Sequence, residues 1–539
     1  MISFKKTLLK DHTRVLFFLF MAMGIFARVW KFGIVPGDIN PDEAFAGYDA
    51  YNLLHYGMDS AGYRFPVYLT TWGSGTSALN TYLMIPFMAV FGAKIWVIRL
   101  PQVIVACLTL WVTYLLVKRL FCEKAALCAL FLLAISPWHI GMSRWGMDCN
   151  MAPGFMIFGL YFFVRGLEDN KYLMLSALMY GLSLYCYATI WPIVPLVVLL
   201  QLIYGLACRK IRFDRYLLLS GLILGVLAMP LLLFLLVNMD VIGEIRLPFL
   251  SIPRLVVMRG SEVSFSGLPE KARRLWSILK FQSDDMPWNA TGKYGIYHAG
   301  TLSFFVLGLF YCVKTSVEKM RRSEEAPELL LLIQTGGGVL LGLLVYTNIN
   351  RNNILFIPMM IVAALGICYL CSLIDLRYLI LPAAFYLCMF IGFERYYFTE
   401  YDEILKYHFC YGLKDAVKEA VSYDGQIYVS YGLKHPDILF LAQVPVTEFI
   451  ETVEYYNYPD AYLETRSFSR FSYDFDPTAP DTDATYILSQ SVDTVPFEQT
   501  GFTLHTYGFY TVAHCPQESK TPQQADGVSI LQRSKLRGI

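Results

Sequence analysis

Residues 97–117 read VIRLPQVIVACLTLWVTYLLV, an almost wholly apolar run. A run of this length can cross the roughly 30 Å hydrocarbon core of a bilayer as one helix. Similar runs recur along the chain, and we count about eleven of roughly 17 to 25 residues. They lie near 15–35, 97–117, 124–140, 151–167, 172–188, 190–208, 216–238, 298–317, 328–346, 354–373 and 377–395. The sequence therefore predicts a polytopic α-helical membrane protein.

The composition agrees with this prediction. The 539 residues are 56% hydrophobic, with a mean hydropathy of +0.46, and only 16% are charged, against about 25% for an ordinary soluble domain. This excludes a soluble fold. The net charge of +1, from 44 basic and 43 acidic residues, produces no global field that would attract nucleic acid.

The placement of charge predicts the orientation. Basic residues precede the first apolar run and no small-residue cleavage site follows it, which indicates a retained signal anchor with a cytoplasmic N-terminus. Four basic connections then face the cytoplasm, as the positive-inside rule requires. They are 118–119, 165–171, 208–215 and 314–322. With an odd number of spans, the chain divides into a membrane domain, 1–395, and an extracytoplasmic C-terminal domain, 396–539.

One further apolar segment, Leu79 to Phe91, is short and is followed by Gly92. We interpret it as an interfacial or re-entrant helix. Counting it as a span would invert every later segment and move residues 314–322 outside, which the charge rule disfavours.

After Glu400 the sequence becomes more polar. The segments 426–431, 485–488 and 509–513 have the alternating, β-rich character of strands, and 415–422 has that of a short helix. We therefore predict a small α/β or α+β domain at the C-terminal end.

The first outside loop, residues 35–51, reads VPGDINPDEAFAGYDAY and places Asp42 and Glu43 beside the membrane surface. Adjacent carboxylates there are candidates for a general base or a metal ligand. The alternative is a solvated first turn of a helix that begins after Asn40-Pro41, since proline and acidic residues favour that position.

Other polar residues gather at the outer ends of the spans. Residues 136–150 read SPWHIGMSRWGMDCN and carry Arg144 and Asp148, which are either functional or a structural ion pair and anchor. Arg351 suits bidentate capture of a lipid phosphate, with interfacial anchoring as the alternative. Arg99 opens the second span on the same face. The stretch WGSGTS, residues 72–77, is a flexible turn whose backbone N–H groups can approach a sugar or phosphate.

Together these features resemble the GT-C glycosyltransferases. The loop with Asp42-Glu43, the near-surface helix that ends in Phe-Gly, the Arg-Leu-Pro at 99–101 and the Ser-Pro-Trp motif that begins at Ser136 carry the resemblance. It is closest to the family 39-type branch, which includes protein O-mannosyltransferases and lipid A aminoarabinose transferases. It covers roughly residues 10–395, and its specific motifs lie in the first 150 residues.

The resemblance implies an inverting transfer of a sugar from a polyprenyl-phosphate or dolichyl-phosphate donor on the outer face of the membrane. Asp42 matches the catalytic base, Glu43 completes the motif, and Asp148 orients the acceptor. Arg144, Arg351 and Arg99 are the candidates to bind the donor phosphate. A divalent cation, Mg²⁺ or Mn²⁺ held by Asp42 and Asp148, is left open. The acceptor is a lipid, a glycan or a protein, and the compact chain implies a bacterial plasma membrane.

Two functions of other classes compete with this one. A flippase for lipid-linked sugars, or another transporter, should have charged or broken helices near the middle of the membrane. An assembly protein whose tail binds wall components would leave Asp42 replaceable.

Overall fold

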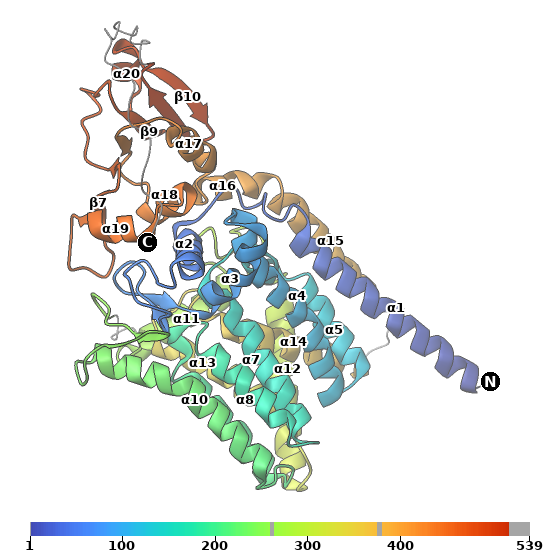
Figure 1. The fold of residues 1–539 in the computed structure, drawn as a ribbon. Coiled ribbons are helices and arrows are strands. Elements are labelled where there is room, and N and C mark those ends of the chain that lie inside the picture. Colours follow the sequence, from blue (N-terminus) through green and yellow to red (C-terminus); the bar gives the residue numbers. More distant parts are fainter. Residues whose placement is uncertain (1, 259–262, 374–379, 517–539) are drawn as a thin grey trace, which may run out of the picture.

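The computed structural model describes residues 2–258, 263–373 and 380–516. A body of helices carries a mixed α/β domain at one end (Figure 1). Each predicted span contains a helix, although the predicted segment 377–395 begins outside the described residues. The helices are α1 (Ile2–Val29), α4 (Ile95–Leu120), α5 (Glu123–Ala134), α7 (Ala152–Gly166), α8 (Tyr172–Ser183), α9 (Ile193–Ala207), α10 (Arg215–Asn238), α12 (Thr301–Arg321), α13 (Glu328–Leu344), α14 (Phe356–Leu373) and α15 (Ile380–Tyr397).

Five helices in the described part of the chain are long and apolar enough to cross a membrane. They are His12–Val29, Ile95–Leu120, Arg215–Asn238, Thr301–Arg321 and Asn353–Leu373. Shorter apolar helices accompany them, at Leu79–Phe91, Tyr172–Ser183, Ile193–Ala207 and Glu328–Leu344. The chain is therefore a multi-pass helical membrane protein, and the count of about eleven spans stays a prediction.

Three of the helices are extended at one end by a 3₁₀ turn. The turns η1 (Asp148–Met151), η2 (Ala188–Ile190) and η4 (Asn353–Leu355) lead into α7, α9 and α14. A 3₁₀ turn rises about 2.0 Å per residue, more than an α-helix, so each turn lengthens a helix at little cost in residues.

The basic connections predicted to share one face are joined to one another. Arg119 pairs with Glu168, which links the α4–α5 and α7–α8 connections. Lys210 Nζ lies 2.8 Å from Glu325 Oε1, which links the α9–α10 and α12–α13 connections. Asn170 Nδ2 donates to Asp214 Oδ2 at 2.9 Å, which joins the α7–α8 connection to the α9–α10 connection, so the four loops lie together at one end of the helical body.

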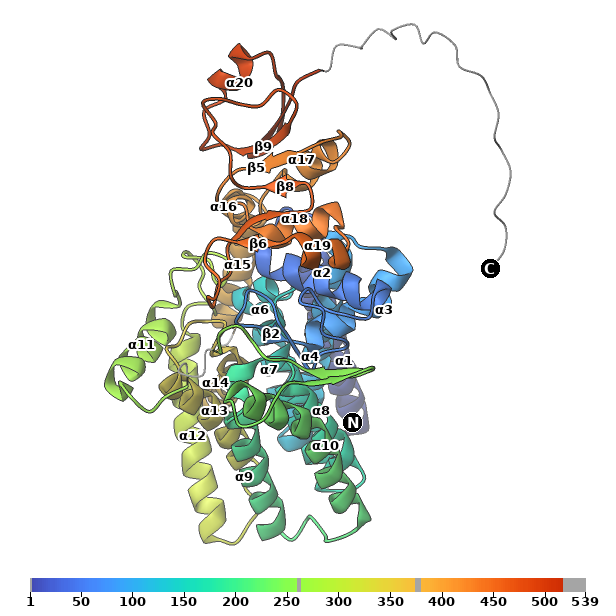
Figure 2. The same cartoon turned by 60° about the vertical axis from the view of Figure 1, so that its left-hand side comes forward.

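The opposite end carries short elements that cap the helices. They include α2 (Pro41–His55), α3 (Leu79–Phe91), α6 (Pro137–Met142), α11 (Leu268–Phe281) and the hairpins β1–β2 (Tyr68–Leu69, Thr76–Ser77) and β3–β4 (Ile245–Leu247, Leu250–Ile252). Figure 2 shows α2 and α3 side by side at this end, below the sheet domain. The segment Leu79–Phe91 is thus a helix, as predicted, and it ends at Gly92, whose φ of +78° suits glycine.

The C-terminal domain is built on a seven-stranded mixed sheet in the order β10-β11-β9-β5-β8-β7-β6. The central strand β5 runs parallel to β8 and β9, and the other pairs are antiparallel. The strands are β5 (Ile427–Val429), β6 (Glu454–Tyr455), β7 (Thr465–Phe468), β8 (Phe471–Ser472), β9 (Thr485–Ser489), β10 (Thr503–Tyr507) and β11 (Tyr510–His514). The helices are α16 (Glu400–His408), α17 (Leu413–Ala420), α18 (His435–Ala442), α19 (Val446–Thr452) and α20 (Val495–Gln499). The prediction of a mixed domain of helices and strands is confirmed.

This domain is docked on residues 35–51, the loop that the sequence predicts to lie outside. Ala44, Phe45 and Tyr48 of α2 share one hydrophobic core with Ile438 and Phe440 of α18. The backbone is tied as well, because Ile39 N donates to Phe409 O at 2.9 Å and Gly412 N donates to Asp38 Oδ2 at 2.7 Å. The domain therefore helps to hold the loop that carries Asp42.

Candidate active site

A cavity of about 350 Å³ lies at the end of the helical body that carries the C-terminal domain. Asp42, Asp148 and Arg351, three of the residues predicted from the sequence, line it. They come from the first turn of α2, the start of η1 and the loop that precedes η4. This convergence makes the cavity the candidate active site.

Asp42 owes its position to the way in which α2 begins. The side chain of Asn40 accepts a hydrogen bond from Asp42 N at 3.1 Å, and Pro41 occupies the first helical position. The Asp42 carboxylate is exposed, and Trp72 Nε1 donates to its Oδ1 at 3.0 Å. Asp42 therefore lies in the first turn of a helix, which was the alternative interpretation of this motif, and at the same time lines the cavity. The helix start holds the carboxylate at the cavity, where the helix dipole favours its charge.

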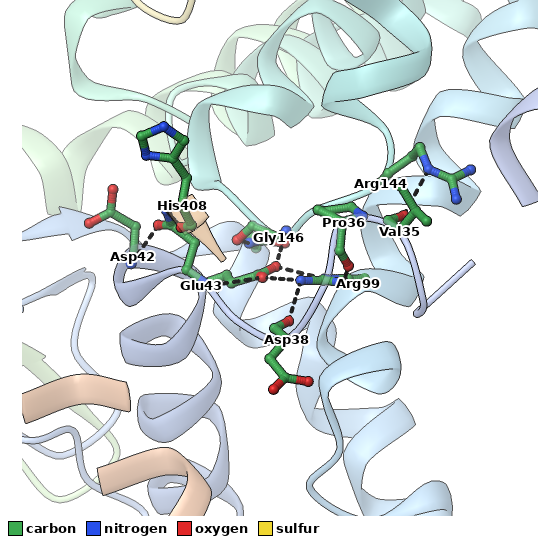
Figure 3. A network of polar contacts seen from close by, with 11 residues as sticks. Val35, Pro36, Asp38, Asp42, Glu43, Arg99, Arg144, Gly146 and His408 are labelled. Atoms are coloured by element: carbon green, nitrogen blue, oxygen red, sulfur yellow. Dashed lines mark hydrogen bonds and ion pairs between the residues drawn. The ribbon is translucent and has the colours of Figure 1, made fainter. Parts of the chain in front are cut away.

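Glu43 points away from Asp42 and is completely buried (Figure 3). Arg99 Nε donates to Glu43 Oε2 at 3.0 Å, Arg99 Nη2 also bonds to Oε1, and Gly146 N donates to Oε2 at 2.8 Å. Two further N–H groups of Arg99 donate to Pro36 O and Asp38 O, at 3.0 and 2.7 Å. Glu43 and Arg99 thus join the first loop, α4 and the loop after α6.

Arg144 fixes the exit of the first span. It is fully buried and donates to Val35 O at 3.0 Å, as Figure 3 shows, and also to Arg28 O at 2.9 Å and Trp30 O at 2.6 Å. These carbonyls follow or end α1, where the last turn of a helix lacks intrahelical donors. Neither Arg144 nor Arg99 is among the described residues that line the cavity.

Asp148 links the second motif to the glycine-containing turn at 72–77. Its Oδ2 accepts from Ser77 N at 3.1 Å, and its Oδ1 accepts from Cys149 N at 2.7 Å. The turn needs glycine, since Gly73 and Gly75 have φ of +96° and +77°. Trp72 and residues 74–77 line the cavity, so the turn noted in the sequence is part of the site.

Arg351 is the only lysine or arginine among the described residues that line the cavity. Its backbone N donates to Asn348 Oδ1 at 2.7 Å, and its Nη1 donates to Tyr346 O at 3.4 Å. The side chain is half-buried. Its position suits a group that meets an anion at the wall of the cavity.

Several lining residues were not foreseen. Tyr187 and Trp191 lie at the adjoining ends of two predicted spans, 172–188 and 190–208, and the aromatic character of these ends was their only local signal. Tyr462 comes from the C-terminal domain. The position of Tyr462 at the cavity depends on how the C-terminal domain docks, and no local sequence pattern predicts that docking.

An apolar groove of about 450 Å³ adjoins the cavity. Ala188, Thr189, Trp191 and Met258 line both spaces. The rest of the groove is lined mainly by apolar residues of α9 and α10, among them Pro195, Ala228, Leu231 and Leu235. A polar cavity beside an apolar groove suits a ligand with a charged head and a hydrocarbon chain.

The residues that line the cavity suit a divalent cation that prefers oxygen ligands. No group of three or more His, Cys, Asp or Glu side chains is arranged to hold a metal within the described ranges. Asp42 and Asp148 both line the cavity, and one or two carboxylates suit Mg²⁺ or Mn²⁺, which complete their shells with water and substrate phosphate. Zinc prefers nitrogen and sulfur ligands, and no His or Cys is among the described residues that line the cavity, so Mg²⁺ or Mn²⁺ fits these residues better. The need for a cation stays a prediction.

A model of a known protein family matches part of the chain. Residues 78–241 match the family model described as Dolichyl-phosphate-mannose-protein mannosyltransferase. The matched region includes Arg99, Arg144 and Asp148, whereas Asp42 and Arg351 lie outside it. No curated protein matches the chain.

Two solved structures of one protein share the fold. ArnT from Cupriavidus metallidurans in the apo state is 13% identical with a TM-score of 0.55, over 94% of this chain and 98% of ArnT. The same protein bound to undecaprenyl phosphate is 13% identical with a TM-score of 0.54, over 95% and 98% of the two chains. The Archaeoglobus fulgidus oligosaccharyltransferase in the apo form is 14% identical with a TM-score of 0.45, over 80% and 64%.

The family match and the ArnT-like fold agree with the resemblance that the motifs indicated: over residues 78–241 this chain is similar to the dolichyl-phosphate-mannose-protein mannosyltransferase family, and over most of its length it shares the fold of ArnT.

Proposed function

We propose that this chain transfers a sugar from a polyprenyl phosphate to an acceptor in the cavity, on the extracytoplasmic side of the membrane and with inversion of the anomeric carbon. The observation that carries the proposal is the meeting of Asp42, Asp148 and Arg351 in one cavity beside an apolar groove. The structure of ArnT bound to undecaprenyl phosphate supports this donor class.

The groove along α9 and α10 takes the prenyl chain of the donor. Its lining is almost entirely apolar, and it meets the cavity at Thr189 and Trp191. A chain held there would bring the phosphate and sugar to the polar cavity and leave the hydrocarbon among apolar side chains.

Asp42 acts as the general base. As the acceptor oxygen or nitrogen attacks the anomeric carbon, its proton passes to the Asp42 carboxylate. The bond between the anomeric carbon and the phosphate oxygen breaks, and polyprenyl phosphate leaves. General-base help of this kind typically contributes about 10²- to 10⁴-fold. The hydrogen bond from Trp72 Nε1 orients the carboxylate.

Arg351 stabilises the charge that develops on the leaving phosphate, because a guanidinium offers paired N–H donors to phosphate oxygens. Asp148, which also lines the cavity, orients the acceptor. Asp42 and Asp148 would hold a divalent cation if one binds, and such an ion would supply further charge neutralisation to the phosphate.

Glu43, Arg99 and Arg144 act as positioning residues in this proposal. Their side chains are fully buried and are taken up by protein partners, so they keep the first loop in place. The sequence predicted that Arg99, Arg144 and Arg351 bind the donor phosphate. Because Arg99 and Arg144 are enclosed by protein groups, only Arg351 keeps this role in the proposal.

The orientation follows the charge rule. The basic connections joined by the Arg119–Glu168 and Lys210–Glu325 pairs lie at the cytoplasmic end. The cavity and the C-terminal domain then lie on the outer side of the membrane. The resemblance implies that this membrane is a bacterial plasma membrane.

The test is sugar transfer from a panel of radiolabelled polyprenyl-phosphate sugars into endogenous membrane acceptors. Wild type, Asp42→Asn and the control Asp424→Asn, which changes an exposed aspartate of the C-terminal domain, are compared at matched expression. We expect Asp42→Asn to lose about 10²-fold or more of the transfer rate while the control stays normal. Undiminished transfer by Asp42→Asn would remove it as the base. Absence of transfer by wild type from every donor would favour a transporter or an assembly protein.

A further inference from the structure

The C-terminal domain contributes a tyrosine-rich segment to the rim of the cavity. Residues 455–464 read YYNYPDAYLE. The segment lies against the turn at 72–77, because Leu463 N donates to Trp72 O at 2.8 Å and Gly73 forms a β-bridge with Tyr462. A Cβ added to Gly73 would lie 2.5 Å from Asp460 O, so only glycine allows this approach. Tyr462 therefore lines the cavity together with Asp42.

The tyrosines of this rim are exposed although their rings are largely apolar. Tyr431, Tyr456, Tyr458 and Tyr462 expose 72%, 47%, 65% and 53% of their surface. We call these four residues the tyrosine rim. Tyr462 lines the cavity, and Tyr431 and Tyr456 line a neighbouring crevice together with Leu463, the residue next to Tyr462. Exposed aromatic groups that gather in this way mark a surface that binds a partner.

A crevice of about 20 Å³ adjoins the tyrosine rim and shares Tyr431 and Tyr456 with it. That is room for about one water or hydroxyl group. Two further lining residues, Thr465 and Tyr473, are more than nine-tenths buried, and neither hydroxyl oxygen has a hydrogen-bond partner within the described part of the chain. Buried hydroxyls are normally paired, so this crevice suits a ligand that brings hydroxyl groups.

The rim carries little net charge. Lys434 Nζ lies 3.4 Å from Glu464 Oε1, and Tyr431 Oη donates to Glu464 Oε2 at 3.3 Å. The charges of Lys434 and Glu464 therefore offset one another, and the exposed Asp460 of the same segment adds one negative charge. A strongly acidic or basic polymer would find no complementary field here.

We propose that the tyrosine rim binds the acceptor and that the acceptor is a neutral glycan chain. The apolar C–H face of a pyranose ring packs on an exposed tyrosine ring, while its hydroxyl groups meet the phenol groups and the crevice. A chain held on Tyr431, Tyr456 and Tyr458 leads past Tyr462 to Asp42. This inference rests on the proposed function and adds the class of acceptor to it.

At the end of the held chain, a hydroxyl oxygen of the terminal sugar attacks the anomeric carbon of the donor. Its proton passes to Asp42, a new glycosidic C–O bond forms, and the C–O bond to polyprenyl phosphate breaks. No oxidant, reductant or further co-reactant is needed.

The first experiment measures binding to the full-length protein in lipid nanodiscs by calorimetry. The probes are neutral gluco-, manno- and galacto-oligosaccharides from monosaccharide to hexasaccharide, with a serine- and threonine-rich peptide for comparison. We expect wild type to bind at least one oligosaccharide series with an affinity that rises with length. Tyr431→Ala and Tyr458→Ala should each weaken binding about tenfold or more, equivalent to about 1.4 kcal/mol. Tyr407→Ala is the matched control, because Tyr407 is 72% exposed on α16.

The second experiment separates this inference from the proposed function. With a donor that wild type consumes, donor hydrolysis by water is measured without acceptor, and transfer is measured with the bound oligosaccharide. We expect Tyr458→Ala to raise KM for the oligosaccharide and to leave donor hydrolysis unchanged. The inference is overturned if wild type binds none of the oligosaccharides, if both tyrosine variants bind as wild type does, or if the peptide binds in their place. Rim-dependent oligosaccharide binding without consumption of any donor would refute the proposed function and keep the glycan site.

Discussion

Arg99 Nε donates to Glu43 Oε2 at 3.0 Å in a place where neither side chain is exposed to solvent. The pair connects the first turn of α2 to the first turn of α4, so it holds the helix that carries Asp42. A buried ion pair is costly to break, because loss of one partner leaves the other charged and buried.

We expect Arg99→Ala to destabilise the protein by about 3–5 kcal/mol, since the buried Glu43 carboxylate would lose its cationic partner and keep only hydrogen bonds from backbone N–H groups. The measurement is thermal unfolding in detergent, with Arg273→Ala, an exposed change on α11, as the control. Arg99→Ala combined with Glu43→Gln should recover part of the loss. If Arg99→Ala melts like wild type and instead raises KM for the donor, Arg99 binds the phosphate directly, as the resemblance implied.

Arg351 should act on the donor rather than on the fold. We expect Arg351→Ala to lower transfer by about 10²-fold with little change in melting temperature, because a half-buried guanidinium at the wall of the cavity stabilises phosphate charge. Arg351→Lys should retain part of the activity, since a lysine keeps the charge but not the paired donors. Initial rates over a range of donor concentrations test this. Normal rates in both variants would show that Arg351 only anchors the loop.

The apolar groove should discriminate donors by chain length. Ala228→Trp places a large ring in the groove on α10, so we expect a higher KM for long-chain polyprenyl donors and an unchanged KM for donors with a short prenyl chain. Val226→Trp is the control on the same helix, because Val226 is 61% exposed and does not line the groove. Equal effects on long and short donors would mean that the prenyl chain lies elsewhere.

Asp437 should make stability depend on pH. Burial raises the pKa of the Asp437 carboxyl well above its usual range, and the charges of Asp42 and Glu43 raise it further. The folded state therefore binds this proton more tightly than the unfolded chain, whose pKa stays near 3.8. The stabilising contribution is full below that value and is lost as pH rises through the folded-state pKa.

We expect the melting temperature of wild type to fall relative to Asp437→Asn as pH rises from about 4 to about 9, because the amide cannot ionise. Thermal unfolding of both proteins across this range measures the difference. Parallel curves would show that Asp437 does not titrate between the two states.

The local features of this protein were readable in the sequence. Helical spans depend on the hydrophobicity of neighbouring residues, so each predicted segment contains a helix. The start of α2 at Pro41 follows from Asn40 and Pro41 in the same way, and it places Asp42 at a helix N-terminus without any tertiary information.

Only the tertiary structure decided which of the polar residues meet. Asp42 and Glu43 are neighbours in the sequence, yet one faces the cavity and the other is buried against Arg99, because successive side chains on a helix point about 100° apart. Arg351 reaches the cavity whereas Arg99 and Arg144 are enclosed by carbonyl and carboxylate groups from distant segments. Burial of a charge depends on what the rest of the chain packs around it, and the same holds for Tyr462, which reaches the site only because the C-terminal domain docks on α2.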